Sequence, residues 1–172
     1  MKKLHLGCGT EHRKGWVNID ANKKCKPNIV SPAHRLPMFK NGSADVIEAC
    51  HLLEHLPYLQ GIKALREWNR ILKRGGLLFL ELPDFARCVA ILGKFKDPKG
   101  YDMGMIGIYG HPPMVETDGL FQTHKWGWTA PALIETLTRV GFTEVTKIPP
   151  TQKWRLAHKM NTKRDMRIRA VK

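Results

Sequence analysis

Near its start the chain reads Leu4-His5-Leu6-Gly7-Cys8-Gly9-Thr10, and four residues later Gly15-Trp16-Val17-Asn18-Ile19-Asp20. The pattern predicts a strand over residues 3–6 that stops at a Gly-x-Gly turn, and a strand over 16–20 that ends on a carboxylate. Such glycines let the backbone turn sharply and let a ligand approach main-chain N–H groups, because no Cβ intrudes. A carboxylate that ends the next strand can accept hydrogen bonds from both hydroxyls of a ribose. Together these features indicate a site for a nucleoside-bearing cofactor.

The glycine turn departs from the full dinucleotide fingerprint, which requires Gly-x-Gly-x-x-Gly and an acid about 20 residues further on. His12 stands where the third glycine would be, and Asp20 follows Gly7 by only 13 residues. Many turns contain a lone Gly-x-Gly, so this motif alone does not indicate a cofactor site. The strand before it and the acid after it support that interpretation.

Taken with the rest of the chain, the motif Leu-x-Leu-Gly-Cys-Gly resembles the first motif of small class I S-adenosylmethionine-dependent methyltransferases. Later segments match that family in order, namely residues 36–39, 43–47, 51–56, 65–67, 71–76 and 140–142. The resemblance implies a three-layer Rossmann-like α/β fold, with a mostly parallel sheet and an antiparallel last strand. It also implies S-adenosylmethionine as cofactor and methyl transfer to an O, N or C nucleophile.

The resemblance assigns a set of cofactor-binding residues. Gly7, Cys8 and Gly9 are expected around the methionine and ribose through their backbones, with Asp20 on the ribose hydroxyls and Ala21 beside it. Many relatives have an acidic residue for the adenine amine where this chain has Pro32. Adenine recognition is therefore expected from main-chain groups and from apolar contact with Leu36. Cys50 and His51 are expected near the methionine end.

The segment His51-Leu52-Leu53-Glu54-His55 also matches the inverted zinc-peptidase motif. Such a site needs a helix of several turns and a further ligand, and Pro57 breaks any helix almost at once. In the methyltransferase interpretation, His55 faces the substrate or is a buried structural histidine. Methyl transfer needs a base only if the nucleophile carries a proton at pH 7, a task that suits histidine. His55 and His124 are the predicted catalytic residues.

The remaining elements follow from periodicity and turn signals. Strands are expected over residues 28–30, 45–50, 77–82 and 143–148, with an antiparallel last strand over 165–171. Helices are expected over 59–74, ended by Gly75-Gly76, and over 130–140, capped by Thr129. Asp84 either orients the substrate or caps the next helix. Residues 87–128 are expected to be irregular, with substrate-side candidates Tyr109, His111, His124 and Trp126.

Length and composition fit one domain over residues 1–172, with 84–128 as an inserted lid or substrate segment. The chain has 172 residues, of which 42% are hydrophobic. No apolar run reaches the about 20 residues that cross a membrane, and no signal-peptide core is present, so a cytoplasmic protein is expected. The four cysteines form no Cys-x-x-Cys pair, which argues against a zinc ribbon and a disulfide framework.

The chain is strongly basic, with 29 Lys and Arg against 15 Asp and Glu and a formal net charge of +14. Such a field attracts nucleic acid, phosphorylated metabolites or an anionic membrane surface, although solvated basic faces give the same composition. Six basic side chains gather in one loop, namely Lys153, Arg155, His158, Lys159, Lys163 and Arg164. An anionic small-molecule substrate is expected, and nucleic acid is an alternative partner.

The first two expected strands are separated only by residues 7–15, so the first crossover is cut to about one turn. The sequence also begins directly with the first strand. The site is therefore expected to be open or to be closed by another subunit, as in a homodimer. Two other functions stay open, a nucleic-acid-binding module on a degenerate methyltransferase scaffold and a non-catalytic partner subunit. The acceptor has no signature in the sequence.

Overall fold

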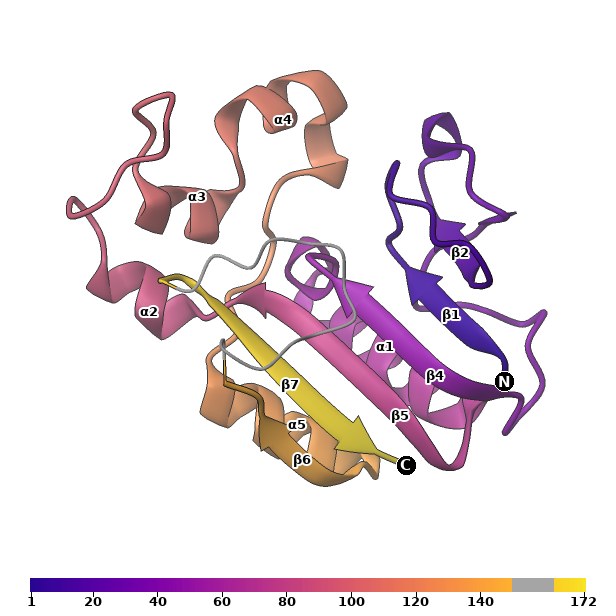
Figure 1. The fold of residues 1–172 in the computed structure, drawn as a ribbon. Coiled ribbons are helices and arrows are strands. Elements are labelled where there is room, and N and C mark those ends of the chain that lie inside the picture. Colours follow the sequence, from indigo (N-terminus) through magenta and orange to yellow (C-terminus); the bar gives the residue numbers. More distant parts are fainter. Residues whose placement is uncertain (150–162) are drawn as a thin grey trace.

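The computed structural model describes residues 1–149 and 163–172, which form a mixed seven-stranded sheet of order β3-β2-β1-β4-β5-β7-β6 (Figure 1). Five strands are parallel, namely β1 (Lys3–Leu6), β2 (Val17–Asp20), β3 (Ile29–Val30), β4 (Ala44–Cys50) and β5 (Leu72–Pro83). β6 (Thr143–Lys147) and β7 (Asp165–Val171) are antiparallel, with β7 inserted between β5 and β6. The expected fold class is confirmed.

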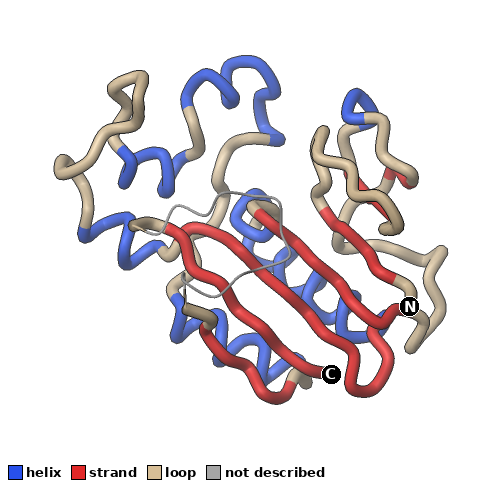
Figure 2. The backbone as a smooth tube through the Cα atoms, viewed as in Figure 1, coloured by secondary structure: helices blue, strands red, loops and turns tan. Residues whose placement is uncertain are grey.

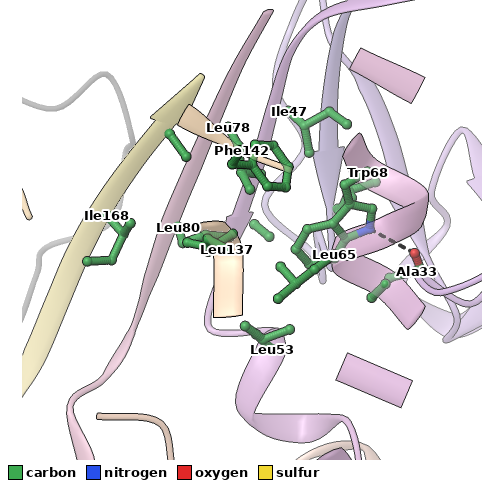
Figure 3. Packing of buried hydrophobic residues seen from close by; sticks show 14 of the residues in the cluster. Ala33, Ile47, Leu53, Leu65, Trp68, Leu78, Leu80, Leu137, Phe142 and Ile168 are labelled. Carbon is green, nitrogen blue, oxygen red and sulfur yellow. Dashed lines mark hydrogen bonds between the residues drawn. The ribbon is translucent and has the colours of Figure 1, made fainter. Parts of the chain in front are cut away.

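Two longer helices, α1 (Tyr58–Ile71) and α5 (Ala130–Val140), pack on one face of the sheet (Figure 1). Successive side chains of β1 and β5 point to opposite faces of the sheet. The face toward the helices carries core residues, namely Leu4, Leu6, Leu78 and Leu80. The opposite face carries the buried polar side chains of His5 and Glu81. Trp68 of α1 is fully buried, and its indole N–H donates to the Ala33 carbonyl at 2.8 Å (Figure 3). This bond ties the core to the loop after β3.

The first crossover is short, as expected, but the single helical turn expected there is absent from residues 7–16, and Figure 2 shows only loop between β1 and β2. α5 also has the expected bounds, and the Thr129 hydroxyl accepts the N–H of Ala132 at its N-terminus. The four cysteines are all free, as expected. Within the described ranges, no helix has both the length and the apolar character that a membrane span requires.

The expectation that the first long helix extends to residue 74 is wrong. α1 ends at Ile71, because Leu72 is extended and already pairs with Ala44 of β4. The Lys172 ammonium donates to the carbonyls of Arg70, in the last turn of α1, and of Leu72, the first residue of β5, at 3.2 and 2.7 Å. Sheet pairing therefore begins before the two glycines that were expected to stop the helix.

Residues 85–121 contain short helices where an irregular segment was expected. These are α2 (Phe85–Ala90), α3 (Met103–Tyr109) and α4 (Pro112–Asp118), followed by a 3-10 turn, Gly119–Phe121. The glycines allow close packing: a Cβ at Gly107 would lie 2.3 Å from Cys88 Sγ of α2. Asp84 occupies the cap position of α2 without a side-chain cap bond, and instead lies 3.5 Å from the Lys147 ammonium.

Candidate functional site

The glycine turn after β1 is held by Asp20 at the end of β2. Gly7 and Gly9 both have positive φ, of 64° and 49°, which an L side chain rarely adopts. One carboxylate oxygen of Asp20 accepts the N–H of Gly9 and the other accepts the N–H of Asn22, each at 2.8 Å. A Cβ at Gly7 would lie only 2.9 Å from Leu52 Cδ1, so this backbone passes unusually close to its neighbour.

Two hollows open at the carboxyl ends of the strands, the edge at which open α/β sheets bind ligands. The first, called here the β2-side hollow, encloses about 290 Å³ and is bordered by Asp20, Ala21 and residues 31–34. The second, the lid-side hollow, encloses about 320 Å³ and extends below α3 and α4 to Cys50, His124 and Arg164. Both hollows are bordered by Gly7, Gly9, His51, His55 and Gln122.

The structure brings most of the sequence-predicted residues to these hollows. The β2-side hollow is bordered by Gly7, Gly9, Asp20, Ala21, His51 and His55. The lid-side hollow is bordered by Gly7, Cys8, Gly9, Cys50, His51, His55, His111 and His124. Tyr109 and Trp126 border neither hollow, and Trp126 packs instead on Tyr58 with ring centroids 4.6 Å apart.

The expectation for Leu36 needs correction. Its side chain is fully buried in the core and borders neither hollow, while its N–H donates to the Glu67 carboxylate at 2.8 Å. Pro32, Ala33 and His34 border the β2-side hollow in its place. Of the six basic loop residues, Lys153, Arg155, His158 and Lys159 lie outside the described residues, and Arg164 borders the lid-side hollow.

His51 is surrounded by three carboxylates. Its backbone is left-handed, with φ of 47°, and its N–H donates to the Glu81 carbonyl at 2.7 Å. Its ring lies 3.1 Å from Glu54 through Nδ1, and 3.5 and 3.7 Å from Asp165 and Glu81 through Nε2. Burial alone would lower the pKa of His51, but the bonds to Asp165, Glu54 and Glu81 outweigh it and raise that pKa well above its usual value. His51 is therefore a cation at neutral pH.

The carboxylates of this cluster stay ionised. Burial alone would raise the pKa of Asp165 and of Glu54, but the His51 imidazolium reverses this and lowers both pKa values to about 2. Further cations complete the cluster, since Arg164 bonds Asp165 at 2.8 Å and Arg167 bonds Glu81. Sequence reasoning did not find this cluster, whose acids are contributed by three separate parts of the chain.

His55 and His124 lie side by side, with ring centroids 4.8 Å apart. Nδ1 of each ring makes a hydrogen bond to a backbone carbonyl. His55 bonds the carbonyl of Thr123 at 3.2 Å, and His124 bonds that of Gly107 at 2.9 Å. Burial, aided by the neighbouring His55, lowers the pKa of His124. Its ring is therefore neutral at pH 7 and has a lone pair on Nε2.

The thiols near the hollows are poor nucleophiles, because only the thiolate reacts readily. Burial, together with the Asp20 charge, raises the pKa of Cys8 to about 11. Burial and the nearby Glu81 raise the pKa of Cys50 further. The hollows therefore offer histidine, carboxylate and backbone groups for chemistry rather than thiolates.

Comparisons with known proteins agree with the fold. The methyltransferase domain family model matches residues 8–80. A SAM-dependent methyltransferase from Archaeoglobus fulgidus has a similar structure, with a TM-score of 0.65 and 18% identity over 99% of this chain and 86% of that one. An S-adenosylmethionine-dependent methyltransferase from Mesorhizobium loti gives 0.62 and 15%, over 99% and 90%. No curated protein sequence matches the chain.

A third similar structure is a complex between the Haloferax volcanii Trm112 methyltransferase activator and a methyltransferase. Its TM-score is 0.63, with 14% identity over 99% of this chain and 81% of that one. At such identities the solved structures establish a shared fold, and the family model matches the segment from Cys8 through β2, β3 and β4 into β5.

Proposed function

We propose that this chain is a class I S-adenosylmethionine-dependent methyltransferase that methylates an O, N or C nucleophile of an anionic small molecule. The match of residues 8–80 to the methyltransferase domain model and the shared fold support this proposal. The observation that carries the proposal is the shared wall between the two hollows, which Gly7, Gly9, His51 and His55 border from both sides. A methyl donor on one side of this wall and an acceptor on the other would meet beside the glycine turn.

The β2-side hollow suits the nucleoside part of the cofactor. Each Asp20 oxygen accepts one backbone N–H and keeps a further lone pair for a ribose hydroxyl. Among the described residues, no atom lies within 4 Å of the position that a Cβ of Gly9 would take, so the methionine part can approach the backbone there. At Gly7 the corresponding space is filled by Leu52. Residues 32–34 would then take the adenine ring, in the place first expected for Leu36.

The lid-side hollow suits an anionic acceptor, because Arg164 borders it and the whole chain is basic. S-adenosylmethionine, when bound, supplies a methyl group that its sulfonium has already activated. The residues of this chain then need mainly to hold the nucleophile in line with that group and to keep water away. In this proposal His55 and His124, which both border the lid-side hollow, take a proton from an acceptor hydroxyl or amine.

Calorimetric titration with S-adenosylmethionine and with S-adenosylhomocysteine tests the cofactor site. Asp20→Asn removes the negative charge that the ribose hydroxyls would bond, so we expect binding to weaken by about tenfold or more. Asp45→Asn is the matched control, because Asp45 lies at the opposite end of β4 and bonds Lys73. Equal affinities for wild type and Asp20→Asn would contradict the assignment of Asp20.

The same titration separates the alternatives. If the chain binds neither compound, the net charge of +14 favours the nucleic-acid-binding module, and a salt-dependent RNA-binding assay would follow. If binding appears only after a second protein is added, the chain works as one subunit of an assembly. The structural neighbour solved with its activator makes that arrangement worth testing.

A further inference from the structure

Three metal-ligating side chains meet beside the lid-side hollow. Glu54 and His55 come from the 3-10 turn Leu53–His55 that follows β4, and His124 comes from the segment before α5. One ligand-type atom from each side chain lies within 4.8 Å of the other two. His55 and His124 also border the hollow, so an ion between them would be reachable from it.

The backbone around this cluster is fixed from both sides. The Glu54 carbonyl accepts the N–H groups of Lys125 and Trp126, at 2.8 and 3.2 Å, and the His55 ring bonds the Thr123 carbonyl. The two segments that supply the ligands are therefore joined directly to each other. A site built on segments so connected loses little entropy when an ion binds.

The hydrogen bonds of the two histidines leave the metal-binding edge of each ring open. A carbonyl oxygen only accepts hydrogen bonds, so Nδ1 of His55 and of His124 must be the protonated nitrogen that donates. In the neutral ring Nε2 then carries the lone pair. Metal-ligating histidines almost always donate their other N–H to a carbonyl or carboxylate in this way.

Glu54 supplies a second, independent observation. It is only 2% exposed, and its Oε1 atom bonds His51. Its Oε2 atom is buried and has no hydrogen-bond partner in the part of the chain that the structure describes. A buried carboxylate oxygen without a partner is costly, and a bound cation would satisfy it.

We propose that Glu54, His55 and His124 bind one divalent transition-metal ion, with Zn²⁺ as the reference case. Two imidazoles and one carboxylate are a common ligand set for such ions, and three protein ligands leave at least one position open. Ligand atoms around zinc lie about 3.3 Å apart, given a Zn–N distance of about 2.0 Å, so the side chains draw together on binding.

The open position deepens the proposed function and rests on it. It faces the lid-side hollow, where an oxygen of the acceptor would bind the ion. A hydroxyl bound to such an ion would be more acidic, so its proton would pass to water and its oxygen would form the bond to the methyl carbon as the carbon–sulfur bond breaks. The acceptor class then narrows to molecules with a hydroxyl or carboxylate group.

A neighbouring set, Cys50, His51 and Glu81, also has metal-ligating atoms within 4.8 Å of one another. There the ring nitrogens of His51 already face three carboxylates, and Glu81 also pairs with Arg167. This set is satisfied by its own ion pairs. Of the two sets, only the one with Cys50 contains a thiol, so the absorption spectrum of bound cobalt distinguishes them.

Cobalt titration of the full chain after EDTA treatment tests the proposal. We expect saturable binding of one Co²⁺ per chain, seen as visible absorption bands, and displacement of the cobalt by Zn²⁺. His124→Gln should weaken Co²⁺ binding at least about tenfold, the scale seen when even an outer partner of a metal ligand is lost. His111→Gln should leave the affinity unchanged, because His111 borders the same hollow but lies outside the ligand set.

Three outcomes would overturn the proposal: no saturable binding, an unchanged affinity in His124→Gln, or a thiolate-to-cobalt absorption band that assigns the ion to Cys50. Circular dichroism in EDTA checks that the variant folds, and His55→Gln replaces it if it does not. Cofactor titration of the EDTA-treated chain separates the two proposals. If the chain binds the cofactor but no metal, the proposed function stands and the metal site fails. If it binds metal but no cofactor, the metal site stands and the proposed function fails.

Discussion

Asp20 has a structural task before any ligand binds, because its two oxygens hold the N–H groups of Gly9 and Asn22. These bonds fix the path of the chain on both sides of the β2-side hollow. A change at Asp20 therefore alters the turn as well as the ligand contact. Asparagine keeps one oxygen acceptor, which is why it is a sharper test there than alanine.

Replacing Gly7 tests the close approach at this turn. Gly7→Ala places a side chain at φ of 64° and a Cβ 2.9 Å from Leu52, so both backbone strain and collision oppose folding. We expect the free energy of unfolding to fall by at least about 2 kcal/mol, measured by urea denaturation.

Gly15→Ala is the matched control, because Gly15 has φ of 78° and open space where the Cβ would lie. It should lose only the cost of the left-handed conformation, about 1 kcal/mol. An equal loss in the two variants would mean that the contact with Leu52 is unimportant.

At the residue scale, the sequence predicted which residues lie at the carboxyl edge of the sheet better than it predicted their individual contacts. Gly7 and Asp20 were placed there by the strands that precede them, and His51 by the family resemblance, and all three border the β2-side hollow. Leu36 was misplaced because its apolar side chain packs into the core instead of lining the hollow. Whether Asp20 and the predicted histidines act as proposed stays a prediction.

Among the elements, α5 shows most directly how a capping residue recognised in the sequence contributes to the stability of the fold. Thr129→Ala removes the hydroxyl that accepts the Ala132 N–H at the start of the helix, so the free energy of unfolding should fall by about 1 kcal/mol. Thr138→Ala on the same helix is the control. Its hydroxyl bonds only the Ile134 carbonyl one turn back, and its loss should change the stability by less than about 0.5 kcal/mol in urea denaturation.

The ends of a helix could be predicted where capping residues in the sequence determine them. They could not be predicted where pairing with a distant strand determines them. Thr129 and Gly141 mark both ends of α5 by their own chemistry. Helical periodicity continues past Ile71, but pairing of Leu72 with Ala44 ends the helix, and no local signal announces that pairing. The short helices after β5 were missed because their glycines, such as Gly107, serve close packing, while glycine in a sequence ordinarily indicates a loop.

Across the whole molecule, the charged cluster around His51 exists only because of the strand order. Cys50 of β4 pairs with Glu81 of β5, and Glu81 pairs with Arg167 of β7. Residues far apart in the sequence therefore share one line across the sheet. A single sequence gives the strands but not this register, so the cluster was not predictable.

The cluster predicts how stability depends on acid. The pKa of Asp165 is lowered from 3.8 to about 2 in the folded chain. Its contribution is therefore fully present above pH 4 and is lost as the pH falls toward 2, by about 2 kcal/mol for a shift of this size. Urea denaturation at several pH values should show this loss in the wild type and a smaller one in Asp165→Asn.

Glu135→Gln is the control for this series, because Glu135 is exposed on α5 and pairs with Arg139 across one helical turn. It should keep the wild-type dependence on pH. His51 acts in the opposite direction: because its folded pKa is raised, its contribution is complete below pH 6.5 and is lost only as the pH rises through the folded value. If Asp165→Asn retained the full acid sensitivity, the loss would come from other carboxylates.

The place of β7 between β5 and β6 has a consequence for synthesis. Among the seven described strands, β6 joins the sheet through β7 alone, and β7 is translated after the other six. Until it emerges from the ribosome, β5 presents an open edge, and Glu81 and His51 lack Arg167 and Asp165. A nascent chain stalled before residue 163 would thus expose an edge prone to aggregation and would be an early target for chaperones and proteases.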